Sequence, residues 1–265
     1  MNTLLNALLG LALATVGGSP LICAVRIKTP PLIRDQNGVS APRLAMAPTA
    51  GTWKYKSTDV IPGGTYLSTF SIAIKDDGTV WTVTTAWNFP DGPVTDVSTL
   101  EKDTLVLRKE LLKHFPKPGR PWVPVTMKLD FSGNKVTGGT TTANGQRKPV
   151  AVDLEGPVFA DAAASDVTIG CLPLAGAYST TFRNWDVDKL KRRLLRLKVV
   201  GMERVTVPAG TFDSYKVELI SADGLYQHTV WIAKDSRTPV KAQEVEVLGK
   251  GDKKVTSSTT TELVP

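Results

Sequence analysis

Few residues of this chain could carry acid–base chemistry. The 265 residues include two histidines, His114 and His228, and a histidine needs an orienting partner to act as a general base. Two pairs of carboxylates stand at alternate positions, as solvent-facing residues of a strand would: Asp186 with Asp188, and Glu244 with Glu246. The reaction that a pair of carboxylates could catalyse is the hydrolysis of a glycoside. No nucleophile elbow, zinc-protease helix or phosphate-cradling loop accompanies them, so the sequence predicts a non-catalytic protein, with a carboxylate-based hydrolase as a minor alternative.

The two cysteines, Cys23 and Cys171, give no sign of a metal or redox site. Neither belongs to a Cys-x-x-Cys pair or lies beside His or Asp ligands, which zinc sites require. We therefore expect no metal and no cofactor. Cys171 is expected to be a small, buried apolar side chain.

The segment Lys189–Lys198 is strongly basic. Six of its ten residues are cations, which nearly matches the formal net charge of +7 for the whole chain. The pattern fits a strand, with Leu195 and Leu197 on one face, and it also fits a helix, with Leu190, Leu194 and Leu197 stacked; we favour the strand. The cations are Lys189, Lys191, Arg192, Arg193, Arg196 and Lys198.

This basic segment has a structural and a functional interpretation. A solvated face or a charged strand edge that prevents sheet-to-sheet aggregation is the simpler one. The alternative is a patch for an anionic envelope surface, either lipid headgroups or polysaccharide phosphate. Nucleic acid is not expected as a partner, because Trp185 is the only aromatic residue close by and stacking residues should be interleaved.

Aromatic residues recur at positions expected to lie in strands. Most large aromatic side chains form protein cores, but a subset lining a concave hollow would make a site for a lipid or another hydrophobic ligand. The sequence alone leaves both options open. The candidates for such a cavity wall are Trp53, Tyr55, Phe70, Trp81, Trp87, Phe131, Tyr215 and Trp231.

Alternation and turn chemistry predict a mainly β fold. Runs such as Phe70–Ile74 and Val80–Trp87 alternate apolar and small or polar residues and are separated by Asp-Gly, Asn-Gly and Pro-Gly turns, which are strong hairpin signals. Hairpins in series form a meander, which must curl or pack to bury its apolar face. Two segments suggest helix: Thr104–Phe115, as a strand running into a short helix, and the Ala-rich Phe159–Ile169.

The amino-terminal residues differ from the rest. Residues 1–22 contain an apolar run that is shorter than a membrane span and resembles a secretory signal, although no Lys or Arg precedes it. An amino-terminal anchor and a non-targeting tail are the alternatives. Residues 23–50 are expected to be a linker and residues 51–265 a single domain. A periplasmic or secreted location follows from the export interpretation.

Four segments carry a resemblance to a known family: Leu129–Val136, Val199–Phe212, Tyr215–Val217 and Trp231–Val240. In these segments the chain resembles a family of uncharacterised bacterial exported (periplasmic) domains, which are related in fold to the LolA/LolB-like lipoprotein carriers and lipoprotein-sorting proteins. The resemblance implies a strongly curved, unclosed half-barrel of antiparallel strands wrapping one or two short helices. The resemblance implies no catalytic residue, because the features that carry it, a glycine-containing turn and the end of a strand, are structural.

The expected function follows from this resemblance. We expect a non-catalytic envelope domain that binds a hydrophobic or amphiphilic ligand, such as a lipid or a lipoprotein acyl chain, in the concave face of the sheet. The alternative is an envelope scaffold or protein-interaction module with no small-molecule ligand. Fold analogy does not choose between them.

Overall fold

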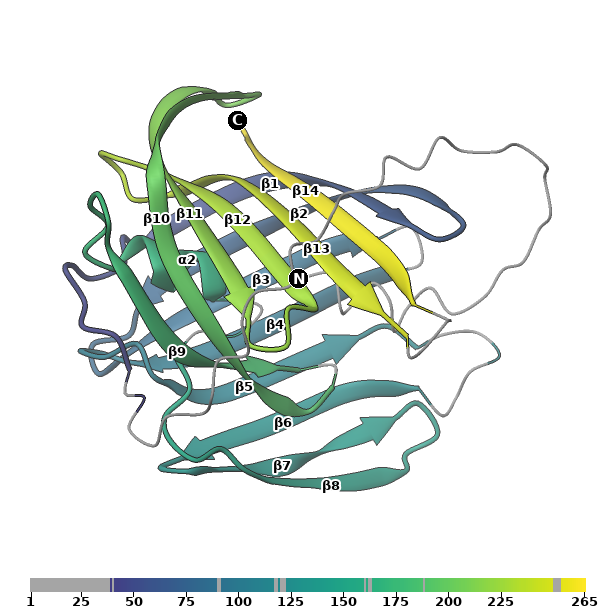
Figure 1. Ribbon diagram of the computed structural model, residues 1–265. Helices are drawn as coiled ribbons and strands as arrows, with labels where there is room; N and C mark the ends of the chain where they lie inside the picture. Colours follow the sequence, from purple (N-terminus) through teal and green to yellow (C-terminus); the bar gives the residue numbers. More distant parts are fainter. Residues whose placement is uncertain are drawn as a thin grey trace.

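The computed structural model describes residues 39, 41–89, 92–116, 119, 123–159, 161, 164–187, 189–249 and 254–265. The signal-like segment and most of the expected linker lie outside these residues. No helix in the described ranges is long and apolar enough to cross a membrane. Figure 1 shows the strands, which are β1 (Gly51–Ile61), β2 (Gly64–Asp76), β3 (Val80–Phe89), β4 (Gly92–Glu101), β5 (Leu107–His114), β6 (Pro124–Ser132), β7 (Lys135–Thr142), β8 (Arg147–Asp153), β9 (Ser179–Asp186), β10 (Lys191–Val207), β11 (Gly210–Ser221), β12 (Tyr226–Ala233), β13 (Pro239–Leu248) and β14 (Val255–Val264).

All fourteen strands belong to one antiparallel sheet. Strands β1 to β8 form one meander and β9 to β14 another, and the two are joined by pairing of β1 with β14, with Tyr55 opposite Leu263. The ends of the sheet are β8 and β9, which do not pair with each other. The expected mainly β, strongly curved and unclosed antiparallel sheet is therefore confirmed.

The predicted turn signals close the hairpins. At the β2–β3 turn Gly78 has φ +82°, a conformation that glycine adopts without steric cost. Its backbone N–H donates a 2.9 Å hydrogen bond to the Asp76 carboxylate. Because hairpin loops fix strand register, these turns also determine which residues face inward.

Burial alternates along the strands, as the period of two requires. In β3 the side chains of Trp81, Val83, Thr85 and Trp87 are buried, and those between them are half-exposed. The buried side chains lie on the inner, concave face of the sheet. A meander of this length has one apolar face, and that face needs a cover.

The cover is the connection between β8 and β9, which we call the plug segment (Leu154–Leu174). It contains helix α2 (Ser165–Gly170), and Figure 1 shows α2 inside the curve of the sheet. The helix is shorter than the predicted Phe159–Ile169, because Phe159 instead forms a β-bridge with Val106. The buried apolar residues of the whole plug segment are Leu154, Val158, Phe159, Ala164, Val167, Ile169, Cys171, Leu172 and Leu174.

The predicted helix within Thr104–Phe115 is wrong. Residues 107–114 form the extended strand β5, with Glu110 and Leu112 facing inward by the alternation of a strand. Leu105 has φ +53°, which breaks any regular helix before the strand begins.

Backbone hydrogen bonds and aromatic contacts fix the plug segment between the two halves of the sheet. The Phe159 N–H donates to the Arg183 carbonyl of β9 at 2.8 Å, and the Leu107 N–H of β5 donates to the Val158 carbonyl at 2.9 Å. The rings of Phe159 and Phe182 meet edge to face at 5.2 Å. The plug segment therefore bridges β5 and β9, two strands that do not pair directly.

Replacing the fully buried Phe159 with alanine should destabilise the protein strongly. Large-to-small changes of this type cost about 3–5 kcal/mol, because the transfer free energy is lost and a cavity remains. Urea unfolding followed by tryptophan fluorescence measures the change. Leu67→Ala, at a side chain that is 72% exposed, is the control and should lie within about 0.5 kcal/mol of wild type. Equal midpoints for the two variants would show that the plug segment does not form part of the core.

Candidate functional site

A histidine between two carboxylates lies on the inner face of the sheet. His228 on β12 and Glu244 on β13 are directly opposite each other in register, and Asp166 reaches them from α2. The His228 Nε2 atom is 2.8 Å from Asp166 Oδ1, and its Nδ1 atom is 3.8 Å from Glu244 Oε2. His228 and Glu244 are each less than a tenth exposed. This arrangement supplies the orienting partner that the sequence did not reveal.

The environment of His228 favours the imidazolium form. Burial lowers the pKa of His228, but the charge and hydrogen bond of Asp166, helped by the charge of Glu244, raise it more, so the net pKa is raised. Burial raises the pKa of Asp166, and the His228 charge and hydrogen bond outweigh this, so its pKa is lowered. Each group therefore stabilises the charged form of the other.

Further charges surround this pair, and we call the whole set the charged cluster. Arg193 Nη2 lies 2.8 Å from Asp186 Oδ2, and its guanidinium lies 4.1 Å from the centre of the Tyr226 ring. The Tyr226 hydroxyl donates to Glu244 Oε2 at 3.1 Å. The members of the charged cluster are Asp166, Asp186, Lys189, Arg193, Tyr226, His228, Glu244 and Glu246.

The charged cluster borders a small hollow. Its cavity volume is about 30 Å³, roughly the share of one water molecule in the liquid. Ser165, Asn184, Trp185 and Val187 complete its wall beside the charged groups. Within the described residues no group of three or more His, Cys, Asp or Glu side chains is arranged to hold a metal ion. The hollow has the acid and base groups that activate a water molecule, but little space for a substrate.

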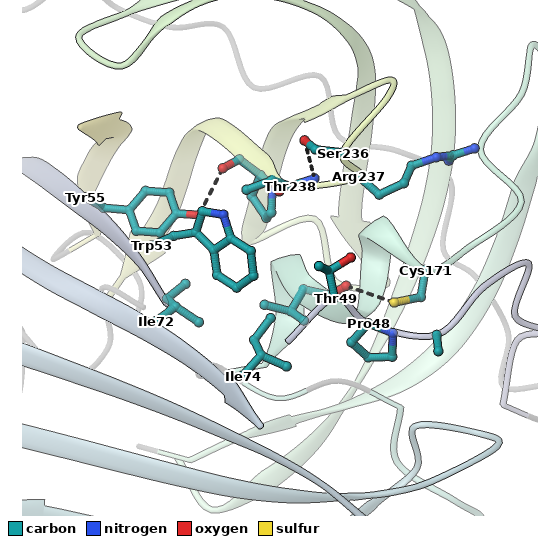
Figure 2. A pocket seen from close by; sticks show the side chains of 13 residues that line it. Pro48, Thr49, Trp53, Tyr55, Ile72, Ile74, Cys171, Ser236, Arg237 and Thr238 are labelled. Carbon is teal, nitrogen blue, oxygen red and sulfur yellow. Dashed lines mark hydrogen bonds between the residues drawn. The ribbon is translucent and has the colours of Figure 1, made fainter. Parts of the chain in front are cut away.

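A second, apolar hollow also borders α2, at Val167. Figure 2 shows Trp53, Tyr55, Ile72 and Ile74 of β1 and β2 facing Cys171 and the β12–β13 turn. Its cavity volume is about 20 Å³. The Tyr55 hydroxyl donates to the Pro239 carbonyl at 3.0 Å. Burial raises the pKa of the Cys171 thiol to about 12, consistent with the inert, apolar side chain expected.

The eight aromatic candidates for a cavity wall have different surroundings. Trp53 and Tyr55 border the apolar hollow. Tyr55, Phe70 and Trp87 form a row of rings with centroids 5.1 and 6.0 Å apart, and these three rings are at most 3% exposed. The remaining inward-facing candidates belong to or pack against the buried core: Trp81, Phe131 and Tyr215.

Trp231 lies on the outer face of the sheet, so it does not line the concavity. Its Nε1–H donates to Glu203 at 2.8 Å, and the Lys216 and Lys241 ammonium groups lie 5.4 and 5.8 Å from its ring. These long side chains cover the indole and leave it 7% exposed. The alternation of β12 puts His228 and Val230 inward, which forces Trp231 outward.

The basic segment is a strand from Lys191 onward, as favoured, but it does not form one patch. Lys189 pairs with Asp186 and Glu246, and Arg193 pairs with Asp186 on the inner face. Arg192 pairs with Glu155. The cations that remain toward solvent are Lys191, Arg196 and Lys198. Half of the predicted anionic-surface candidates are therefore neutralised by carboxylates of the protein itself.

Two expectations about acidic residues are corrected. Glu244, Glu246 and Asp186 are 4%, 2% and 2% exposed, whereas the sequence suggested solvent-facing positions. Asp188 lies outside the described residues. Asp166 and Tyr226 were not singled out from sequence. Tyr226 stands two positions before His228 in the same strand, and this spacing predicts that the side chains of Tyr226 and His228 share a face. No sequence signal relates Asp166 to His228, which are 62 positions apart.

The fold and the hollows define a class of protein: an unclosed antiparallel half-barrel with a filled concavity and a buried charged cluster. A family model described as a protein of unknown function, DUF3108, matches residues 52–256. The chain belongs to this family. No curated protein matches it.

Solved structures resemble the chain at low sequence identity. A β-barrel-like protein of the DUF1849 domain family from Brucella abortus is 11% identical with a TM-score of 0.51, covering 83% of this chain and 97% of its own. A DUF1329 family protein from Desulfovibrio piger is 13% identical with a TM-score of 0.29, covering 81% and 84%. The first supports the β-barrel-like architecture. A relation to lipoprotein carriers stays a prediction.

The pair formed by His228 and Asp166 should make stability depend on pH in a defined window. Because the folded pKa of His228 is raised, its contribution is complete below the unfolded value of about 6.5 and is lost as the pH rises through the folded value. Because the folded pKa of Asp166 is lowered, its contribution is lost only as the pH falls through that lowered value. Asp166→Asn should therefore lower the His228 pKa and flatten the alkaline side of the stability profile.

Imidazole NMR titration and urea midpoints between pH 4 and pH 9 measure the two effects. Asp213→Asn, at an exposed position of β11, is the matched control and should leave the His228 pKa unchanged. An unshifted His228 pKa in Asp166→Asn would contradict the pairing.

Proposed function

We propose that this chain is a non-catalytic interaction module of the cell envelope that binds a partner protein on its surface. The observation that supports it is the plug segment, which fills the concavity where the resemblance to lipoprotein carriers predicts a site for acyl chains. The half-barrel then serves as a rigid scaffold. Export to the envelope is part of this proposal and rests on the signal-like residues 1–22.

The filled concavity weighs against the ligand carrier expected from the sequence. Sites for ligands of lipid or drug size are typically about 300–1,000 Å³, whereas the two hollows beside α2 measure about 20 and 30 Å³. Removing the plug segment would expose at least Leu154, Phe159, Ile169 and Leu172, each 1% exposed or less. At about 1.5–3 kcal/mol each, these four side chains alone amount to roughly 6–12 kcal/mol, comparable with the whole stability of a typical domain.

The charged cluster also fits a structural role better than catalysis. Its ion pairs join acid to base within the protein: Asp166 to His228, Asp186 to Arg193 and Glu246 to Lys189. Buried groups of opposite charge stabilise one another, and a buried charge needs such a partner for the fold to be stable. The non-enzyme expectation is therefore kept as part of the proposal.

The surface best suited to a protein partner is the open edge of β10. Strand β9 pairs with β10 as far as Lys198 opposite Ser179, and the Val199 N–H donates to the Tyr178 carbonyl. From Val200 to Val207 the strand that pairs with β10 in the described chain is β11 alone. Val200 and Met202 on this edge are 40% and 51% exposed. An exposed strand edge accepts an extended segment of another chain through main-chain hydrogen bonds.

Charging this edge should abolish partner binding without unfolding the protein. The double variant Val200→Lys, Met202→Lys places cations where an added strand would lie, and such cations are a natural block to edge pairing. The protein is purified gently from its own host and analysed by native mass spectrometry. We expect wild type with a bound protein and the edge variant without it.

The matched control is Leu67→Lys, which charges another exposed apolar side chain at the β1–β2 end. It should retain the partner. A co-purified lipid in place of a protein would contradict the interaction module and favour the carrier. If the edge variant still binds the partner, the β10 edge is not the binding surface, and the proposal of a protein-interaction module still stands.

A further inference from the structure

A further group of unpaired positive charges lies on the outer face of β5 to β8, far in sequence from the basic segment 189–198. Strand register brings five cations together on this face, which we call the basic face. Lys109, Lys113, Lys128, Lys135 and Arg147 alternate with the buried residues of their strands and are all exposed.

The cross-strand register fixes the layout of the basic face. Lys113 is opposite Thr126, which is opposite Thr141, which is opposite Arg147. Because neighbouring strands are about 4.8 Å apart, this row spans roughly 14 Å. The next row contains Lys128 between Leu111 and Gly139. The cations are thus spread in two dimensions over four strands, at the bottom of the view in Figure 1.

Carboxylates on this face are too few to neutralise it. Asp130 lies 4.0 Å from Lys109, and Asp153 is opposite Lys135 in register. In the part of the chain that the structure describes, Lys113, Lys128 and Arg147 have no ion-pair partner. In the basic segment, by comparison, Lys189, Arg192 and Arg193 are each paired with a carboxylate, and Lys191, Arg196 and Lys198 remain toward solvent.

The residues between these cations indicate what kind of partner the face suits. They are small or uncharged: Leu111, Thr126, Thr137, Gly139, Thr141, Pro149 and Ala151. The rows contain no aromatic ring on which a nucleobase could stack, as single-stranded nucleic acid requires. Four of the five cations are lysines, which act as point charges and lack the planar fork with which arginine recognises single phosphates.

We infer that the basic face docks the protein on an anionic lipid bilayer surface. The interaction is electrostatic: dispersed ammonium groups approach a layer of negative headgroups, and each cation close to such a surface contributes roughly fivefold in affinity. Docking through β5 to β8 uses different strands from the β10 edge, so it is independent of the protein partner proposed above. It adds a location on the membrane surface to the function of the module.

Vesicle co-sedimentation with matched charge variants tests this inference. The face variant is Lys113→Gln, Lys128→Gln, Arg147→Gln. The control is Lys191→Gln, Arg196→Gln, Lys198→Gln, which removes the same charge from the basic segment. The readout is the ratio of binding to vesicles with 30% phosphatidylglycerol over binding to pure phosphatidylcholine, which cancels any contribution of the apolar residues 1–22. Thermal melting checks that both variants are folded.

The face variant should lose roughly 100-fold in this ratio at low salt, and the control should change by less than about fivefold. Wild-type binding should weaken as salt rises, because surface charges are screened. Equal losses in both variants would mean that net charge alone matters and would overturn the inference. Wild-type binding to soluble heparin that is tighter than to the vesicles would also overturn it, by identifying a polyanion as the ligand.

Discussion

Burial of one continuous apolar face governs this structure. Fourteen antiparallel strands in series have inner side chains on every second position, and a sheet of this width must curl and find a cover. The cover comes from within the chain, at the connection between the two meanders. Phe159 and Leu172 of that connection are fully buried, so the curved sheet and the plug segment can only be stable together.

The same constraint explains why charges are found inside. The plug segment brings Asp166 against the inner face, and His228 lies where it can neutralise that carboxylate. A buried charge without a partner is strongly destabilising, whereas a paired and hydrogen-bonded one is tolerated. Arg193 and Asp186 repeat the arrangement between β10 and β9. Paired charges of this kind fix how α2 and the strands align, more than they add to stability.

Local sequence signals were sufficient for the architecture and insufficient for the site. The alternation of Val80–Trp87 and the Asp77-Gly78 turn depend on neighbouring residues, so the strands and hairpins could be predicted. The pairing of Asp166 with His228 depends on how a six-residue helix packs in a concavity, and no local pattern encodes it. Trp231 shows the same limit. Trp231 has a side chain typical of a protein core. The register of β12 nevertheless places it on the outer face, where the neighbouring lysine side chains shield it from solvent as well as a core would.

Charge shows most clearly why register matters. Counted along the chain, the positive excess belongs to residues 189–198. Counted in space, Lys189, Arg192 and Arg193 meet Asp186, Glu246 and Glu155. A second group of unpaired cations, Lys113, Lys128 and Arg147, is separated in sequence and brought together only by three hairpins. An electrostatic surface depends on which charges remain unpaired after folding. The charges that a face of the protein presents are therefore set by strand pairing, and the most basic stretch of the sequence is partly neutralised in the folded protein.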